Sequence, residues 1–397
     1  MSTPIHGSCD PRFASVREVF EKNFPPDIGA AVAVTLHGEP VIDLWGGYRD
    51  ADGTDPWTED TIVNVYSTTK GMAAICAHQL VEQGRLDLDA PVAKYWPEFA
   101  AEGKQDLPVR FLLCHKAGLP APGKQLAAGQ LYDWDAVTSA LAETKPWWKP
   151  GEDHGYHALT YGHLVGEIVR RVSGQSIGAY FKQHVAKPLG LDFHIGLAAE
   201  HDARVAHMVQ ADPPGAGGGV QSGGGPPPEL LPVLAKMMKD MFDKDTVTWA
   251  AFNVSAGQND VNSREWRGAE IPAANGHGTA RSLARVYGAL ANGGEVDGVR
   301  VLERATIDNA RTEQWAGADC VLGGLPMRFG LGFMLRTDLM PITPGPSGFG
   351  HAGAGGSLGF ADPDTGVGFG YVMNKMQQGM LGGAGAFALL NAFYEAL

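Results

Sequence analysis

Three serines of the chain stand in short patterns that mark serine nucleophiles in hydrolytic enzymes. Ser67 begins an S-x-x-K pattern that ends at Lys70, whereas Ser176 and Ser357 each occupy the centre of a G-x-S-x-G pattern. A serine hydroxyl attacks a carbonyl carbon effectively only when a neighbouring base takes its proton. Lysine is a candidate base in the first pattern, and histidine is the base in the second. All three patterns therefore indicate covalent chemistry at an acyl group.

The two G-x-S-x-G matches lack the setting that this pattern needs. A nucleophile elbow leads from a strand into a helix, and its histidine lies later in the chain. Ser176 instead follows a predicted helix that ends at Gly174, which favours a role as the N-cap of the next helix. No histidine follows Ser357, because the last histidine is His351. We interpret both serines as structural.

The surroundings of Ser67 favour the S-x-x-K interpretation. A β-like run over residues 62–66 precedes a helix predicted over 67–83, so Ser67 stands at the start of that helix. The i,i+3 spacing places the Lys70 side chain on the same face as the Ser67 hydroxyl. The positive end of the helix dipole favours an oxyanion and disfavours an ammonium. These effects suit a serine nucleophile beside a neutral lysine; the alternative is a capping serine beside a surface lysine.

Two further motifs follow in order. Tyr156-His157-Ala158 comes first, and His351-Ala352-Gly353 opens a glycine-rich strand near the end. Together with Ser67 and Lys70 they resemble the motifs of the serine β-lactamase and penicillin-binding-protein superfamily, most closely its class C-like members and the family VIII carboxylesterases. Three other segments are similar to the usual runs of that family: residues 86–92, 112–119 and 276–284. The resemblance covers nearly the whole chain.

The resemblance implies a role for each motif residue. Ser67 is the acylated nucleophile, and Lys70 takes its proton. Tyr156 shares the general-base role and activates water in deacylation. A phenol has a pKa of about 10, so this role requires two nearby cations or near-cations, for which Lys70 and His351 are the candidates. The backbone N–H groups of Ser67 and Ala354 form the oxyanion hole, where one donor is worth roughly 3–4 kcal/mol.

Two departures from the family pattern bear on the substrate. β-Lactamases and peptidases carry Tyr-x-Asn where this chain has Ala158, and Lys-Thr-Gly where it has His351, Ala352 and Gly353. Ala352 offers no hydroxyl, and an unperturbed histidine is mostly neutral at pH 7, so the grip on a substrate carboxylate is lost. Gly353 lets a substrate lie along the strand without a Cβ clash.

The resemblance therefore implies a serine carboxylesterase for neutral esters with a short or medium acyl group. Alternatives within the superfamily are a β-lactamase, an amidase or D-aminopeptidase, or an acyltransferase, with weak side activity on β-lactams. A non-catalytic scaffold is a third class. Four aromatic residues are candidates for the acyl pocket and equally suited to the core: Trp134, Trp147, Trp148 and Phe349. His157 is a candidate to support Tyr156, whereas His115 and His154 are interpreted as structural.

The elements that must position these residues follow a simple order, with strands at both chain ends and helices between them. Strands are predicted at residues 30–36, 41–48, 329–335, 348–361 and 367–374. Helices outside the middle are predicted at 11–23, 67–83, 279–291 and 384–397. We expect an α+β, β-lactamase-like fold: an antiparallel sheet built from both ends and flanked by helices, with an inserted all-helical domain.

The length of 397 residues favours two domains. We expect a discontinuous sheet domain of residues 1–84 and 275–397 and a helical domain of residues 85–274, with the site in the groove between them. The glycine- and proline-rich loop 212–228 is either a lid or a plain surface insertion.

Composition excludes several classes of function. Lys plus Arg number 31 against 44 Asp plus Glu, and the net charge of −13 repels nucleic acid and anionic membranes. The start of the chain has no signal-peptide pattern, and no apolar run is long enough to span a bilayer. The four cysteines are far apart, which favours reduced thiols in the cytoplasm over a disulfide framework or metal site. We expect no cofactor and a small-molecule partner, and leave the oligomeric state open.

Overall fold

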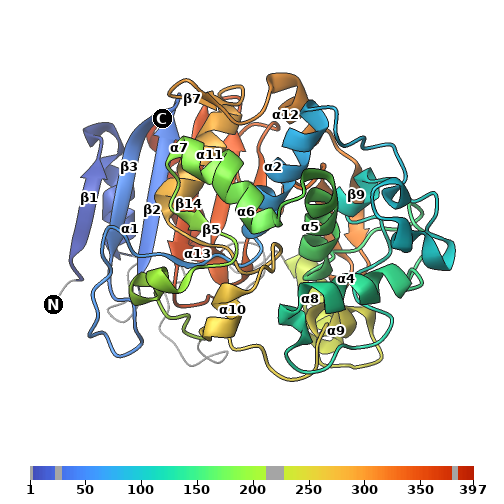
Figure 1. Ribbon diagram of the computed structural model, residues 1–397. Helices are drawn as coiled ribbons and strands as arrows, with labels where there is room; N and C mark the ends of the chain where they lie inside the picture. Colours follow the sequence, from blue (N-terminus) through green and yellow to red (C-terminus); the bar gives the residue numbers. More distant parts are fainter. Residues whose placement is uncertain (1–2, 23–28, 212–227, 378–382) are drawn as a thin grey trace.

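The structure is a computed structural model that describes residues 3–22, 29–211, 228–377 and 383–397 (Figure 1). Its central element is a sheet of nine strands in the order β1-β3-β2-β14-β13-β12-β11-β10-β9. The strands are Ile5–Cys9 (β1), Ala30–Leu36 (β2), Glu39–Gly46 (β3), Trp315–Asp319 (β9), Leu325–Phe329 (β10), Met334–Leu335 (β11), Phe349–Ala352 (β12), Leu358–Asp362 (β13) and Val367–Met373 (β14). Every neighbouring pair is antiparallel.

The two ends of the chain meet inside this sheet. β14 pairs with β2 from Val367 opposite Leu36 to Met373 opposite Ala30. The strands are rich in β-branched and aromatic residues, which suit a pleated surface buried on both faces. The predicted α+β fold with a sheet built from both ends is therefore confirmed.

Helices cover both faces of the sheet. The helices of the described residues are Ala14–Lys22 (α1), Thr69–Glu82 (α2), Arg110–Leu113 (α3), Trp134–Glu143 (α4), Thr160–Ser173 (α5), Ile177–Phe181 (α6), Lys187–Leu189 (α7), Leu231–Asp240 (α8), Val247–Phe252 (α9), Arg264–Gly268 (α10), Ala280–Ala291 (α11), Arg304–Ala310 (α12) and Ala384–Ala396 (α13). Gly370 of β14 faces the backbone of α11, whereas the next residue, Tyr371, points to Gly385 of α13. Side chains alternate along a strand, so α11 and α13 pack on opposite faces.

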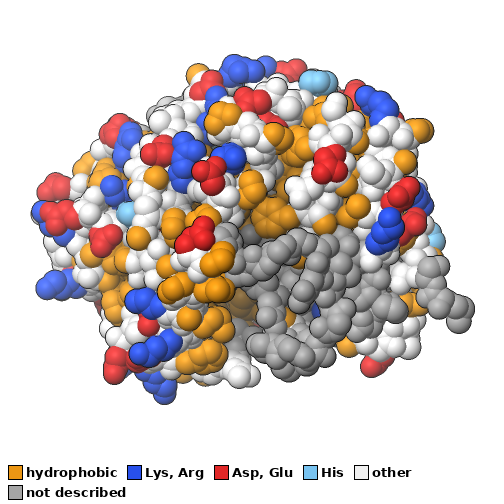
Figure 2. Space-filling view, turned by 180° about the vertical axis from the view of Figure 1, so that it is seen from behind, with side chains coloured by type: hydrophobic (Ala, Val, Ile, Leu, Met, Phe, Trp, Pro, Cys, Tyr) orange, Lys and Arg blue, Asp and Glu red, His pale blue; other side chains and the backbone are white. Residues whose placement is uncertain are grey.

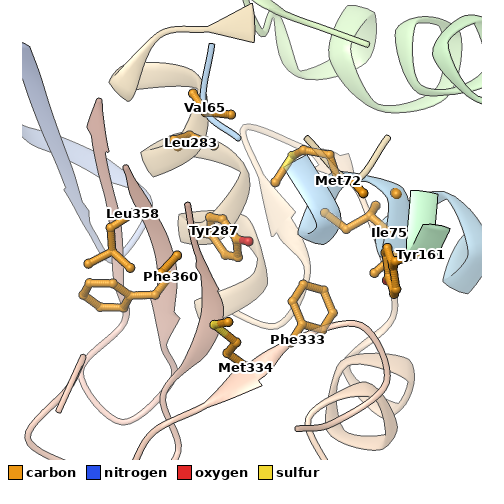
Figure 3. Close-up of a cluster of buried hydrophobic side chains, with 14 of the residues drawn as sticks. Val65, Met72, Ile75, Tyr161, Leu283, Tyr287, Phe333, Met334, Leu358 and Phe360 are labelled. Atoms are coloured by element: carbon orange, nitrogen blue, oxygen red, sulfur yellow. The ribbon is translucent and has the colours of Figure 1, made fainter. Parts of the chain in front are cut away.

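The core beneath the segment that carries Ser67 lies between the sheet, α2 and α11. Met72 and Ile75 of α2 lie on one side of this cluster, and Tyr287 of α11 points into its centre beside the strands (Figure 3). The helices α3, α4, α5, α8 and α9 form a group at the far side of α2 from β1 (Figure 1). None of the helices among the described residues is both long and apolar enough to cross a bilayer.

The middle of the chain also contributes to a small second sheet. β5 (Phe193–His194) pairs with β6 (His277–Gly278), which pairs on its other side with β4 (Val63–Asn64). A separate hairpin joins β7 (Glu295–Val296) to β8 (Val299–Arg300). The small sheet matters for function because β4 leads directly into the segment that carries Ser67.

Two of the strand predictions are wrong in detail. Residues 348–361 form two antiparallel strands, β12 and β13, separated by a short 3-10 turn over Ala354–Gly356. Gly355 has φ +79° and Gly356 has φ +123°, values that reverse the chain and that residues with a Cβ rarely adopt. Residues 329–335 likewise hold the end of β10, a turn and β11. Residues 212–227 of the predicted loop lie outside the described residues, so its role stays a prediction.

Candidate active site

Ser67 lies in a tight turn between β4 and α2. The preceding residue, Tyr66, has φ +45°, a left-handed conformation that costs a non-glycine residue about 1–3 kcal/mol. The turn is fastened by Thr69, whose Oγ1 donates to the Tyr66 carbonyl at 2.5 Å and accepts the Gly276 N–H at 2.9 Å. α2 begins at Thr69, two residues later than predicted, so Ser67 lies just before the helix.

Neither G-x-S-x-G serine has the geometry of an exposed nucleophile. Ser176 Oγ accepts the Ala179 N–H as the N-cap of α6 and donates to Glu270 at 2.6 Å, which confirms the structural interpretation. Ser357 is buried, and its Oγ donates to the Val65 carbonyl at 2.7 Å. Ser357 therefore ties the start of β13 to the turn that carries Ser67, a contact that its motif did not indicate.

Lys70 is completely buried beside Ser67. Its Nζ lies 3.0 Å from Ser67 Oγ, and it donates to the carbonyls of Ala158 at 2.8 Å and Ala273 at 2.9 Å. Burial holds the pKa of Lys70 well below its usual range. A neutral amine has two N–H bonds and one lone pair. The two carbonyls take the two N–H bonds, which leaves the lone pair to accept the Ser67 hydroxyl proton.

Tyr156 lies against the same two side chains. Its ring centroid is 4.6 Å from Lys70 Nζ, and its hydroxyl hydrogen-bonds with Ser67. Burial raises the pKa of Tyr156, and the bond with Ser67 opposes that shift only in part. Burial also lowers the pKa of Lys70 well below its usual range, and lowers that of His351 to about 3, so burial disfavours a cation on either side chain. The predicted influence of these two groups on the phenol stays a prediction.

His351 on β12 faces Tyr156, with a ring-centroid separation of 6.1 Å. Its Nδ1–H donates to the Ala352 carbonyl at 2.7 Å, which leaves Nε2 as an acceptor. Among the described residues, this buried Nε2 has no hydrogen-bond partner. The third motif therefore offers no cation and, at Ala352, no hydroxyl.

Gly353 lies where a side chain would collide with the segment that leads to Ser67. A Cβ at this position would lie 2.3 Å from the Val65 carbonyl oxygen and 2.1 Å from Ser357 Oγ. The missing side chain therefore lets the end of β12 approach the turn that carries Ser67, and the predicted room for a substrate along the strand stays a prediction. The N–H groups of Ser67 and Ala354 have no backbone acceptor within the described residues, as an oxyanion hole requires.

The predicted pocket residues are dispersed. Trp134 donates from Nε1 to Glu167 at 2.8 Å and packs between α4 and α5, and Phe349 is buried against Phe333 with ring centroids 5.2 Å apart. These two occupy core positions, the alternative that the sequence left open. Trp147 is 44% exposed. Trp148 packs edge-on against His157, so it is the one of the four that contacts the Tyr156 segment.

His157 supports that segment, as the sequence suggested. Its Nδ1–H donates to the Gly155 carbonyl at 2.6 Å, and its Nε2 accepts the Leu119 N–H at 3.0 Å. Both ring nitrogens are used, so the imidazole is neutral and fixed. Sequence reasoning missed Asp319, whose carboxylate accepts the Tyr156 N–H at 3.1 Å from 163 residues away. An aspartate at the end of a strand carries no sequence signal for this contact.

Comparisons with known proteins agree with this geometry. The Beta-lactamase family profile matches residues 25–392. Esterase/beta-lactamase LipL of Mycobacterium tuberculosis is 39% identical over 382 residues, which cover 94% of this chain and 83% of that protein. The chain therefore belongs to the Beta-lactamase family, and the resemblance read from the motifs is confirmed.

Two solved structures extend the comparison. The crystal structure of a family VIII carboxylesterase has a TM-score of 0.87 and 39% identity, covering 99% of this chain and 100% of that one. A penicillin-binding protein homolog from Caulobacter crescentus has a TM-score of 0.86 and 39% identity, covering 100% of both chains. The fold is thus the one shared by a family VIII carboxylesterase and a penicillin-binding protein homolog.

The close approach at Gly353 makes a first prediction. Gly353→Ala places a methyl group against the Val65 carbonyl, and such overpacking costs about 1–3 kcal/mol. We expect a lower unfolding temperature together with a loss of at least tenfold in kcat for an ester, because the Ser67 turn must shift. Gly123→Ala is the matched control, since its new Cβ meets only Thr144 at 3.7 Å. Equal behaviour of the two variants in calorimetry and kinetics would contradict this account.

Proposed function

We propose that the protein is a serine carboxylesterase that hydrolyses neutral esters with short or medium acyl chains through an acyl-enzyme on Ser67. The observation that carries the proposal is the contact of one serine hydroxyl with both a buried lysine amine, at 3.0 Å, and a buried phenol. The names of the relatives, an esterase/beta-lactamase and a family VIII carboxylesterase, support the same reaction class.

In acylation, Lys70 is the base. The Ser67 proton moves to the lone pair of Lys70 Nζ as Oγ bonds to the ester carbonyl carbon, and the negative charge goes to the carbonyl oxygen. The N–H groups of Ser67 and Ala354 receive that oxyanion. The new ammonium keeps its bonds to the carbonyls of Ala158 and Ala273, which are the acceptors that a cation needs.

Tyr156 acts as the acid for the leaving alcohol. An ammonium on Lys70, 4.6 Å from the ring, lowers the pKa of the phenol at the moment when the alkoxide departs. The phenol gives its proton to the alkoxide and regains one from Lys70, which returns the amine to its neutral form. In deacylation, water attacks the carbonyl carbon of the acyl-enzyme and gives its proton to the Lys70–Tyr156 pair, in which Tyr156 contacts the water. The pair then returns this proton to Ser67 Oγ as the bond between Oγ and the acyl carbon breaks.

The absence of charge around the site supports a neutral substrate. His351 is neutral, Ala352 has no hydroxyl, and Ala158 replaces an amide-holding asparagine. Lysine and arginine side chains lie interspersed with carboxylates on the face shown in Figure 2. All four cysteines are free thiols, which supports a reducing compartment such as the cytoplasm.

Removal of the nucleophile tests the proposal. Ser67→Ala is expected to reduce p-nitrophenyl butyrate hydrolysis by at least 10³-fold without lowering the unfolding temperature, because no acyl-enzyme forms. Ser176→Ala and Ser357→Ala are the controls from the two competing motifs. Each should keep activity within tenfold and lose about 1 kcal/mol of stability with its hydrogen bonds. Full activity in Ser67→Ala would refute the mechanism.

The role of Lys70 makes a separate prediction. Lys70→Arg keeps a cation that cannot act as a base, so kcat should fall by at least 10³-fold. In the wild type, protonation of Lys70 should abolish activity as the pH falls, and raising the pH should restore it. A fluorophosphonate also reacts with Ser67 only when a base takes the serine proton, and mass spectrometry detects the labelled Ser67. Normal labelling of Lys70→Arg would contradict the role of Lys70 as that base.

Substrate preference separates the esterase from its relatives. We expect p-nitrophenyl esters of two to eight acyl carbons to give the highest kcat/KM, and nitrocefin at least 100-fold less. The comparison matters because one relative is named for both activities. A kcat/KM for nitrocefin above that of every ester would make the protein a β-lactamase in its main activity.

A further inference from the structure

The backbone that carries Tyr156 is held from outside its own segment. Residues 153–157 form no helix or strand. The Gly155 N–H donates to the His115 carbonyl at 3.2 Å, the Tyr156 N–H to Asp319 Oδ1 at 3.1 Å, and the His157 N–H to His115 Nδ1 at 3.1 Å. His115 and Asp319 thus accept hydrogen bonds from three successive backbone N–H groups, which no helix or β-sheet partner accepts.

Asp319 joins Tyr156 to the far edge of the large sheet. It ends β9, and its Oδ1 also accepts the N–H groups of Val321 and Leu322, both at 2.9 Å. The side chain is fully buried. Its second oxygen, Oδ2, is buried with no hydrogen-bond partner among the described residues. A carboxylate buried in this way is costly, and it pairs with no cation here, so its retention calls for an explanation in function.

We propose that Asp319 is a positioning residue that holds Tyr156 against Ser67, and that its ionisation sets the pH range in which the phenol is held. The proposal rests on the role proposed above for Tyr156. An ionised carboxylate accepts the Tyr156 N–H more strongly than a carboxylic acid does. Protonation weakens that bond and adds an O–H for which Oδ2 has no acceptor nearby.

The burial of Asp319 places its ionisation near neutral pH. Burial raises the pKa of Asp319 to about 7, the three N–H bonds oppose the shift, and Asp153 adds to it. Three titratable groups interact with it, Asp153 and Tyr156 from the neighbouring segment and Cys320 from its own turn, and His154 follows Asp153 in that segment. Burial depresses the pKa of His154, and raises those of Tyr156 and Cys320, so neither of the last two ionises near neutral pH.

His115 supplies the part of the support for the Tyr156 backbone that does not change with pH. It is buried with φ +61°, and its ring packs against Tyr156 with centroids 5.0 Å apart. Burial, together with His157 and Lys70, keeps the pKa of His115 well below its usual range. Its Nδ1 therefore remains an acceptor for the His157 N–H at every working pH, and only the Asp319 bond responds to protons.

Stability and activity should respond to pH in opposite directions. The pKa of Asp319 is raised from 3.8, so its contribution to stability is full below about pH 4 and is lost as the pH rises through about 7. Activity should rise over the same range, because the carboxylate holds Tyr156 better. A purely structural aspartate would make activity follow stability. Deprotonation of Lys70 also raises activity with pH, so the part that belongs to Asp319 is the part lost in a variant that cannot ionise at position 319.

Two variants of Asp319 separate its role as a hydrogen-bond acceptor from its ionisation. Asp319→Asn keeps an oxygen for the three N–H groups but removes the ionisation, and Asp319→Ala removes the acceptor. Asp362→Asn is the matched control: this buried aspartate accepts bonds from Asp364, Thr365 and Tyr394 at the β13–β14 turn. Asp319→Asn also serves as the test protein should the alanine variant fail to fold.

Kinetics give the first readout. With p-nitrophenyl butyrate, Asp319→Ala is expected to lose at least 100-fold in kcat with less than threefold change in KM. Asp319→Asn should stay within tenfold of wild type at pH 8 and lose the rise in kcat between pH 6 and 8 that wild type and Asp362→Asn show. An unchanged pH profile in Asp319→Asn would overturn the proposal.

A second readout does not depend on activity. In protein labelled with ¹⁵N-tyrosine, the Tyr156 amide is assigned by its loss in Tyr156→Phe. Its resonance should titrate near pH 7 in wild type and Asp362→Asn and stay constant in Asp319→Asn. A Tyr156 amide that titrates equally in all three proteins refutes the positioning role. If the amide behaves as expected but wild type hydrolyses no ester, the proposed function fails and the positioning of Tyr156 stands.

Discussion

The burial of the Lys70 amine is the constraint on which the site depends. An ammonium in this position has lost its water, and the described residues around it provide two backbone carbonyls and one hydroxyl but no carboxylate. The neutral amine satisfies this set completely, with two N–H bonds to carbonyls and its lone pair on Ser67. Lys104 is equally buried, and its Nζ also donates to two carbonyls. Among the described residues, no hydroxyl hydrogen-bonds with Lys104 Nζ, so Lys104 has no group comparable to Ser67 whose proton it could take.

The rest of the fold maintains that arrangement from several distant parts of the chain. Ala158 and Ala273 supply the two carbonyls, the left-handed Tyr66 aims Ser67, and Ser357 and Gly353 bring β12 and β13 against the turn. The Ser67 turn follows β4 of the small sheet, whereas β12 belongs to the large sheet. The Ser357–Val65 hydrogen bond and the close approach at Gly353 therefore fix the turn and β12 relative to each other. The proposed preference for an uncharged ester rests on the lack of a cation and a hydroxyl at His351 and Ala352.

The sequence predicts the fold because its strands and helices have local signals. Alternating apolar residues mark the strands, and S-x-x-K after a β-like run selects Ser67 and Lys70 as candidates that the structure brings within 3.0 Å of each other. The sequence is silent where one residue depends on another far along the chain. A glycine at 353 carries no mark of the Val65 carbonyl that it must approach. Burial shifts the pKa values of Tyr156 and His351, and the contact of Asp319 depends on the pairing of β9; a short motif encodes neither.

The protonation state of Lys70 tests the account most directly. In protein labelled with ¹³Cε-lysine, the Lys70 resonance can be assigned by its loss in Lys70→Arg and followed with pH beside that of exposed Lys149. We expect Lys70 to be a neutral amine at pH 7, with the chemical shift of the deprotonated form. A Lys70 that stays protonated to pH 9 would contradict it, because the Ser67 hydroxyl would then have no lone pair to take its proton.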